Sequence, residues 1–204
     1  MPEKLYISYN IVHKLCQKAA EEIKASGTKI DLIIAIGGGG FIPARILRSF
    51  LKDGKKNIPI QAVGLSLYEQ MGNASEETIG KEVVRTQWID FGNLSQHLTR
   101  LLAKTSLLWT RWTTRGPRST MPSANCRGTW RRWKRSLRDG ETTNLSVFVL
   151  HNKKKAKRAD LPRDLLDSGR YFVGEHVDDV WIAYPWDAQD IDFHTEEAKK
   201  QGNY

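Results

Sequence analysis

Four consecutive glycines, Gly37 to Gly40, are the residues best suited by type and spacing to bind an anion. The aliphatic run from Leu32 to Ile36 before them is typical of a strand buried on both faces. Glycine adopts backbone conformations closed to other residues and leaves no side chain in the way of a ligand. With Pro43 in the first turn of a following helix, this arrangement can aim backbone N–H groups at a phosphate or pyrophosphate.

A glycine run alone is more often a plain flexible turn, so the flanking strand and helix decide the interpretation. Two better-known phosphate motifs do not fit. Ile42 or Pro43 occupies the place of the third glycine in the dinucleotide motif G-x-G-x-x-G, and no Gly-Lys-Ser/Thr follows as in a P-loop. The run therefore predicts a phosphate or pyrophosphate loop of another kind.

A second group of polar residues lies at the end of the next predicted strand, residues 58–68. Ser66 and Tyr68 close this strand, and the polar, glycine-bearing stretch 69–81 behind them predicts a mobile loop. A returning strand carries Arg85, whose planar guanidinium can bind two phosphate oxygens at once.

The elements that must position these groups alternate between helix and strand. A first helix begins after Ser8 or Asn10 and ends at Gly27. Farther along, residues 145–151 predict a buried strand, which two short strands and a polar C-terminal helix follow. This order predicts an α/β fold for one domain spanning residues 1–204, with a parallel sheet flanked by helices.

The positive charge of the chain is confined to one segment. The chain has 204 residues and a formal net charge of +9. Residues 105–138 hold nine of the 32 basic residues and no acidic one, which leaves 23 basic against 23 acidic residues elsewhere. Basicity is therefore not a property of the whole surface, and a nucleic-acid partner is not expected.

Other bulk features exclude further classes of protein. No apolar run is long enough to span a membrane, and the N-terminus lacks the apolar core of a signal peptide, so no membrane partner is expected. Cys16 and Cys126 offer neither a disulfide framework nor a metal pair, and the five histidines show no ligand spacing. The reducing cytoplasm is the expected compartment.

Three pieces in this order resemble the type I purine phosphoribosyltransferases, especially the fungal hypoxanthine–guanine and xanthine enzymes. The strand followed by G-G-G-G-F-I-P-A-R is similar to the family's pyrophosphate loop, and L-S-L-Y ending at Tyr68 resembles its catalytic lid. The run V-F-V-L-H-N-K ending at Lys153 and W-I-A-Y-P-W-D at residues 181–187 resemble its purine pocket, in a small C-terminal hood. The likeness covers residues 5–103 and 140–200.

The resemblance implies an enzyme of purine salvage that needs Mg²⁺. Such enzymes transfer the phosphoribosyl group of phosphoribosyl pyrophosphate (PRPP) to a 6-oxopurine, namely hypoxanthine, guanine or xanthine, and release pyrophosphate. The ribose carbon passes through a cation-like transition state, so the site must place charge and exclude water. Relatives commonly pair as dimers, so a homodimer is implied too, while the preferred purine stays open.

The resemblance also implies roles for individual residues on the PRPP side of the site. Ser66 and Tyr68 would be catalytic residues of the closing lid. Arg85 would reach the pyrophosphate oxygens. The backbone amides that would hold the pyrophosphate are those of Gly37, Gly38, Gly39 and Gly40.

On the purine side, the resemblance implies that Lys153 donates to the exocyclic oxygen and that the flat face of Trp181 stacks on the ring. The backbone of Ile182 would hydrogen-bond the edge of the base, and Asp187 would help to hold Mg²⁺. The plain alternative for both Trp181 and Trp186 is packing in the core. We expect core packing for Trp186 and stacking for Trp181.

The family's strongest signature is missing from this chain. Between the lid and the strand at 145–151 the family carries a hydrophobic strand, two acidic clusters and a Thr-rich turn that grip the ribose hydroxyls and the 5′-phosphate. The corresponding residues here, 107–120, read L-L-W-T-R-W-T-T-R-G-P-R-S-T. From this cationic, Pro-containing run we expect a disrupted central strand around residues 105–115 and little or no transferase activity.

The genetic code suggests a cause for the departure. When the third base of each codon is joined to the first two bases of the next, Trp109-Thr110 must give Asp, and Trp112-Thr113 must give a second Asp. Permitted codons at the free positions, which we chose, then read V-D-E-V-D-D-T-R-T-T, the missing element. Our hypothesis is that residues from about 104 to 138 are translated out of frame.

Two other functions stay open on the sequence. A non-catalytic relative that regulates through purine or nucleotide binding would bind nucleotide without turnover. A nucleic-acid binder would use the Trp- and Arg-rich segment 105–138, and its binding would depend strongly on salt.

Overall fold

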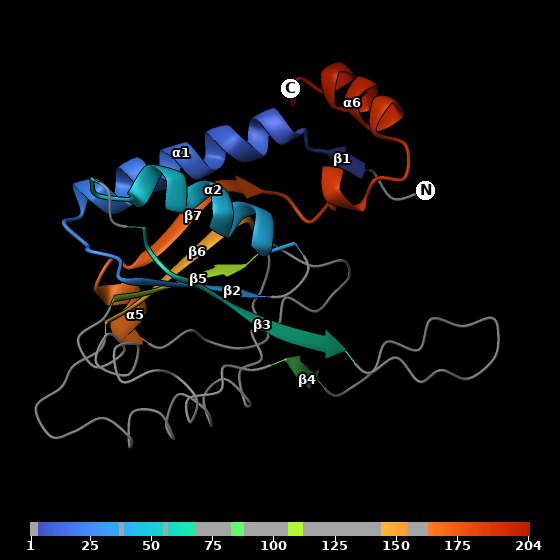
Figure 1. Cartoon of the computed structure of the whole chain (residues 1–204). Coiled ribbons are helices and arrows are strands. Elements are labelled where there is room, and N and C mark those ends of the chain that lie inside the picture. The colour runs from blue at the N-terminus through green and yellow to red at the C-terminus, as the bar shows by residue number, and fades with distance from the viewer. Residues whose placement is uncertain are drawn as a thin grey trace, which may run out of the picture.

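The computed structural model of the chain describes residues 4–36, 39–54, 57–67, 83–87, 106–111, 144–154 and 163–204. Figure 1 shows a twisted sheet with two long helices along one face and a smaller unit near the two termini. Within the described residues, no helix is long and apolar enough to cross a membrane.

Six strands form the main sheet in the order β4-β3-β2-β5-β6-β7. All neighbouring strands are parallel except β4, which runs antiparallel to β3 at one edge. The predicted parallel sheet is therefore confirmed, and its aliphatic strand β2 is buried along its whole length. The strands are β2 (Leu32–Ile36), β3 (Ile60–Leu67), β4 (Val83–Gln87), β5 (Ser106–Arg111), β6 (Asn144–Lys153) and β7 (Tyr171–Val177).

Two helices cover one face of this sheet, α1 (Tyr9–Ala25) and α2 (Phe41–Leu51) (Figure 1). The Ser8 hydroxyl caps α1 by accepting from the N–H of Ile11. Gly27 follows the end of α1 at φ +68°, a left-handed conformation that favours glycine. Both ends of this helix thus lie where the capping residues predict them.

Strand β6 buries alternate side chains in two different clusters. Phe148 belongs to the large core cluster that includes the inner faces of α1 and α2. Val147 and Val149 pack instead with Leu165 of the short helix α5 (Arg163–Asp167). The continuous apolar run of β6 is explained by this coverage of both faces.

A second, two-stranded sheet joins the two ends of the chain. Strand β1 (Lys4–Tyr6) pairs in parallel with β8 (Trp181–Ala183), and the 3-10 turn η1 (Pro185–Asp187) and helix α6 (Ile191–Lys200) follow β8. We call these four elements the hood. The sequence predicts a small C-terminal hood, and the structure adds to it the N-terminal strand β1. Three residues are too few to show the period of a strand.

The expected disruption of the central strand is wrong for residues 106–111. These residues form β5, in which Trp109 lies opposite Ile34 of β2 on one side and opposite Val147 of β6 on the other. The ladder uses backbone N–H and C=O groups, which every residue except proline supplies in full, and Leu, Trp and Thr are tolerated in strands. The rest of the anomalous segment, including Pro117, lies outside the described residues.

Candidate functional site

The turn between β2 and α2 is built so tightly that glycine is required at its last position. Gly39 and Gly40 are both buried, and Gly40 is the N-cap of α2. A Cβ atom at Gly40 would collide with the carbonyl oxygen of Ile36. Among the described residues, no side chain caps the start of α2, and a helix N-terminus of this kind suits an anion. Gly37 and Gly38 lie outside the described residues.

The glycine turn lies at the point where the connections of the sheet change direction. From β2 the chain continues to β3 on one side, whereas β5, β6 and β7 follow one another on the other side. In open α/β sheets, ligands bind at this switch point, beside the carboxyl ends of the strands. The same edge receives the ends of β5 and β6, because β2, β5 and β6 are parallel.

The predicted lid residues belong to the strand pair at the edge of the sheet. Ser66 lies in β3 opposite Val84 of β4, and Arg85 lies opposite Leu65, next to an irregularity between Gly64 and Leu65. The backbones of Ser66 and Arg85 are therefore close neighbours. Tyr68 lies outside the described residues.

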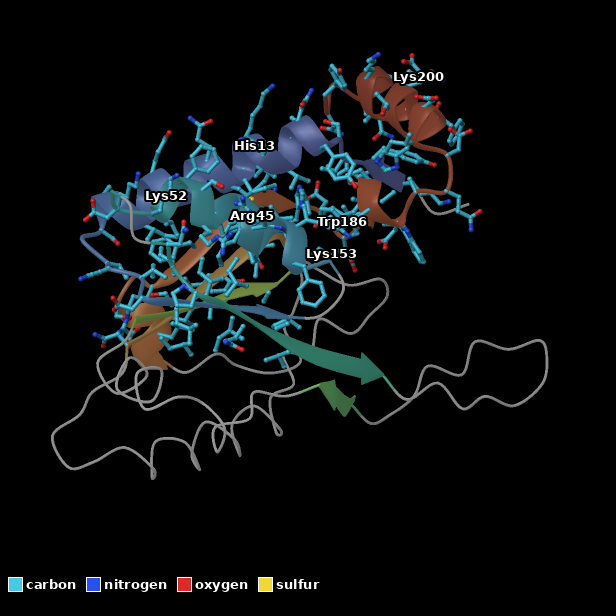
Figure 2. The ribbon with its side chains drawn as sticks, in the orientation of Figure 1. His13, Arg45, Lys52, Lys153, Trp186 and Lys200 are labelled. Carbon is cyan, nitrogen blue, oxygen red and sulfur yellow. The ribbon has the colours of Figure 1, made fainter. Side chains whose placement is uncertain are left out.

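Lys153 is the last residue of β6, at the carboxyl edge of the sheet, and it is 6 % exposed. Its ammonium donates to Oδ1 of Asp179, 3.1 Å away, in the loop that leads to Trp181. A second pair, Lys154 with Asp178 at 3.5 Å, joins the same two segments. Figure 2 shows Lys153 at the end of the molecule that carries the hood. The structure thus ties the predicted purine donor to the start of β8.

A pocket of about 260 Å³ opens among the elements of the hood. Trp181, Ile182 and Asp187 line it together, so the structure brings three of the predicted residues to one cavity. Lys153 is not among the residues that line it. The predicted purine site is therefore divided, with its stacking residue in the hood and its ammonium on the main sheet.

Two aromatic residues of this pocket were not predicted from the sequence. Tyr6 of β1 and Phe193 of α6 line the cavity and meet edge to face, with their ring centroids 6.2 Å apart. Flat aromatic walls beside the Lys4 and Asp187 side chains suit a planar ring with a polar edge. No sequence signal marks Tyr6, because its strand has three residues, and Phe193 is an ordinary helix residue by pattern.

Trp186 is a packing residue, as the sequence predicts. It is half-buried against the main core cluster, and its ring stacks on that of Tyr184 at 4.5 Å and 8°. Cys16 is likewise a packing residue, since burial raises the pKa of its thiol to about 12 and keeps it protonated.

Asp187 has the chemistry of a magnesium ligand but no ready-made cage around it. Among the residues that the structure describes, no three His, Cys, Asp or Glu side chains are grouped to hold a metal ion. Mg²⁺ is commonly bound through only one or two carboxylates together with substrate phosphates, so a single carboxylate on the pocket wall fits this ion.

Comparison with known proteins finds close relatives in two yeasts. The chain is 52 % identical to xanthine phosphoribosyltransferase 1 of Saccharomyces cerevisiae, over 98 % of both chains. It is 47 % identical to the hypoxanthine-guanine phosphoribosyltransferase of Schizosaccharomyces pombe, over 99 % of this chain and 98 % of the relative. No protein-family model matches the chain.

Solved structures share the fold over nearly the whole length. A hypothetical protein from Neisseria gonorrhoeae, solved with bound ppGpp, is 33 % identical with a TM-score of 0.72, over 98 % of both chains. A purine phosphoribosyltransferase from Pyrococcus horikoshii has a TM-score of 0.57 over 90 % of this chain and 93 % of that one. At 20 % identity, the second likeness shows the fold alone.

Proposed function

The chain belongs to the purine phosphoribosyltransferase family, and on that premise we propose that it transfers the phosphoribosyl group of PRPP to a 6-oxopurine. The acceptor is hypoxanthine, guanine or xanthine, and the products are the nucleoside monophosphate and pyrophosphate, as in purine salvage. The observation that carries the proposal is 52 % identity to a xanthine phosphoribosyltransferase over 98 % of both chains.

In this reaction the bond between the ribose carbon and pyrophosphate breaks, and pyrophosphate leaves with the electron pair. A ring nitrogen of the purine bonds to the same carbon and gives up its proton. Positive charge develops on the sugar and negative charge on the leaving group, so the protein acts by placing charges and excluding water.

The pyrophosphate is proposed to bind at the turn from Gly37 to Gly40. Support comes from the buried, side-chain-free turn at Gly40, the uncapped start of α2, and their location at the switch point of the sheet. Arg85 is proposed to bind pyrophosphate oxygens, and Ser66 and Tyr68 to close over the substrates. The adjacent backbones of Ser66 and Arg85 at the sheet edge support a shared role.

The purine is proposed to stack on Trp181, with the Ile182 backbone at its edge and the Lys153 ammonium at its exocyclic oxygen. The Asp179 carboxylate that holds Lys153 is 51 % exposed, whereas the ammonium is buried. Asp179 can therefore turn towards water and leave a donor to the base, while Lys153 stays in place.

Asp187 is proposed to hold Mg²⁺ together with substrate oxygens, where the ion would supply positive charge to the pyrophosphate. The proposal also includes a homodimer and a cytoplasmic location. Support for the cytoplasmic location comes from the two cysteines, which lie far apart in the sequence and suit a reducing compartment.

A turnover assay with PRPP, Mg²⁺ and each of the three purines tests the function. Two chains are compared, the chain as printed and one in which residues 104–138 are replaced by the alternative reading frame. We expect product from the restored chain and little or none from the printed one. Near-normal turnover by the printed chain would refute the frame hypothesis but support the function. Failure of both chains would overturn the function.

A further inference from the structure

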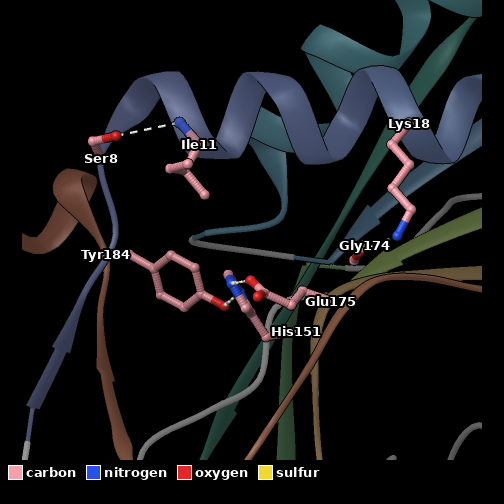
Figure 3. A network of polar contacts seen from close by, with 7 residues as sticks. All are labelled: Ser8, Ile11, Lys18, His151, Gly174, Glu175 and Tyr184. Atoms are coloured by element: carbon pink, nitrogen blue, oxygen red, sulfur yellow. Dashed lines mark hydrogen bonds and ion pairs between the residues drawn. The ribbon is translucent and has the colours of Figure 1, made fainter. Parts of the chain in front are cut away.

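A buried histidine joins the main sheet to the hood. His151 of β6 is fully buried, and its Nδ1 lies 2.8 Å from the hydroxyl oxygen of Tyr184 (Figure 3). Its Nε2 lies 3.5 Å from Oε2 of Glu175, the residue opposite it on β7. Tyr184 is itself 1 % exposed, so this contact is sheltered from water at both ends.

The chemistry of the three groups assigns the direction of the hydrogen bond. Burial lowers the pKa of His151 to about 4, so the ring is neutral at neutral pH and carries one N–H. Nε2 makes no hydrogen bond among the described residues, but the Glu175 carboxylate 3.5 Å away only accepts, which favours the N–H at Nε2. The Nδ1 lone pair then accepts from the Tyr184 hydroxyl. One directional bond therefore links β6 to the hood.

His151 and Tyr184 are close in the chain to the two halves of the divided purine site. His151 lies two residues before Lys153 on β6. Tyr184 directly follows β8, which carries Trp181, and precedes the turn that carries Asp187. The Lys153–Asp179 and Lys154–Asp178 ion pairs join β6 to the loop before β8. Ile182 adds apolar packing, which is not directional and permits sliding.

We propose that the Tyr184–His151 hydrogen bond is a positioning contact of the purine site, which sets the place of the hood against Lys153. Neither residue needs to touch the base. The bond holds Trp181 at the separation from the Lys153 ammonium at which one purine reaches both. This inference rests on the proposed function, because it takes Trp181 and Lys153 as the two contacts of one base.

Tyr184→Phe removes the hydroxyl, keeps the ring that stacks on Trp186, and leaves Nδ1 of His151 without its donor. Binding of GMP, IMP and XMP is measured by calorimetry on the full chain and on the full chain with residues 104–138 in the alternative reading frame, with inorganic pyrophosphate as a second ligand. We expect purine mononucleotides to bind about tenfold more weakly, since displacements near 1 Å have effects of this order or larger. Pyrophosphate binding at the glycine turn is expected to be unchanged.

Two further variants separate positioning from general damage. His151→Asn keeps an acceptor near the position of Nδ1 and is expected to retain mononucleotide affinity. His151→Leu removes the acceptor and is expected to bind mononucleotides more weakly. Tyr9→Phe is the matched control, because Tyr9 is 45 % exposed at the start of α1. It is expected to leave every affinity unchanged.

The outcomes distinguish failure of this inference from failure of the proposed function on which it rests. If the unaltered chain binds a mononucleotide and Tyr184→Phe binds it equally well, the inference is overturned and the function stands. Equal weakening of mononucleotide and pyrophosphate in Tyr184→Phe also overturns it, because the effect is then general. If the chain with residues 104–138 in the alternative reading frame also binds no purine mononucleotide, the proposed function and the inference with it are overturned.

Discussion

Three single residues carry the main tests at the scale of side chains. Gly40 is the N-cap of α2, Lys153 lies at the end of β6, and His151 lies inside β6. Each has a contact that another residue type would change. Their effects differ in kind, because one is a backbone collision, one an ion pair and one a buried titratable ring. Each can therefore be tested separately.

Gly40→Ala is expected to weaken pyrophosphate binding at least tenfold and to lower the free energy of unfolding by about 1–3 kcal/mol, because the new methyl group meets the Ile36 carbonyl oxygen. Calorimetry with Mg-pyrophosphate and urea unfolding measure the two effects. Ser49→Ala, on the exposed side of α2, is the control. Full pyrophosphate affinity in Gly40→Ala would contradict the placement of the site.

Asp179→Asn is expected to lower the free energy of unfolding by about 1–2 kcal/mol, because it leaves the buried Lys153 ammonium without its carboxylate. The neighbouring Asp178→Asn is a matched control. Its partner Lys154 is 61 % exposed, so this change is expected to cost less than about 0.5 kcal/mol. If urea unfolding gives the same loss of free energy for Asp179→Asn and Asp178→Asn, burial of Lys153 does not strengthen its ion pair.

The free energy of unfolding is expected to fall by about 2 kcal/mol between pH 7.5 and pH 5.0 through His151 alone. Burial lowers the pKa of this ring from 6.5 to about 4, so the unfolded chain takes up the proton first. The contribution is fully present above pH 6.5 and is lost as the pH falls towards 4. Urea unfolding of His151→Asn should show a correspondingly smaller loss, and a loss equal to that of the unaltered chain would refute this origin.

At the scale of elements, the hood depends on contacts between the two termini. Gln201, just after α6, uses its side-chain amide to accept from the Tyr6 N–H and to donate to the Lys4 carbonyl, both at 2.8 Å. The amide thus takes the place of a further strand beside β1. The Asn203 carbonyl also accepts from the N–H of Ser8. A strand of three residues is held in place by its neighbours rather than by its own propensity.

Gln201→Ala is expected to lower the free energy of unfolding by about 1–2 kcal/mol, because two backbone groups of β1 lose their partner. Hydrogen exchange should accelerate at the Tyr6 amide and stay slow in β6. Gln17→Ala is the control, since this exposed glutamine donates to Glu21 on its own helix and does not contact β1 among the described residues. Unchanged exchange at Tyr6 would show that β8 alone holds β1.

At the scale of the whole molecule, one sheet accommodates a segment whose composition differs from the rest of the chain. The described part of that segment, β5, pairs in register with β2 and β6 although it belongs to the run proposed to be out of frame. Pairing of the backbone therefore does not show that the side chains are the ones the site needs. The fold and the phosphate chemistry are separate questions here, because the first uses the backbone and the second uses side chains.

Sequencing the transcript through codons 104–138 is expected to reveal a shifted frame that encodes acidic residues at positions 109 and 112. The same shift would remove the excess of nine basic residues and bring the net charge of the chain close to zero or below. An unbroken frame as printed would refute the hypothesis. In that case the chain would be a relative that keeps the fold without the usual phosphoribosyl-binding element.

The sequence by itself determined the features that are local. The buried strand β2, the glycine turn, the capped helix α1 and the parallel α/β order follow from period, glycine and capping residues over a few positions, and the structure confirms them. The family resemblance was also recoverable from short motifs in a fixed order. The expected disruption around β5 was wrong because it was inferred from the side-chain composition of the segment. Strand pairing depends on backbone groups instead.

Only the tertiary structure decided the contacts between distant residues. The pairing of β1 with β8, the Lys153–Asp179 pair and the His151–Tyr184 bond each join segments that no local pattern connects. The residue types involved occur throughout ordinary proteins, so their meaning depends on what the folded chain brings beside them. The glycine run could be found from the sequence alone, whereas the division of the proposed purine site between sheet and hood required the positions of both.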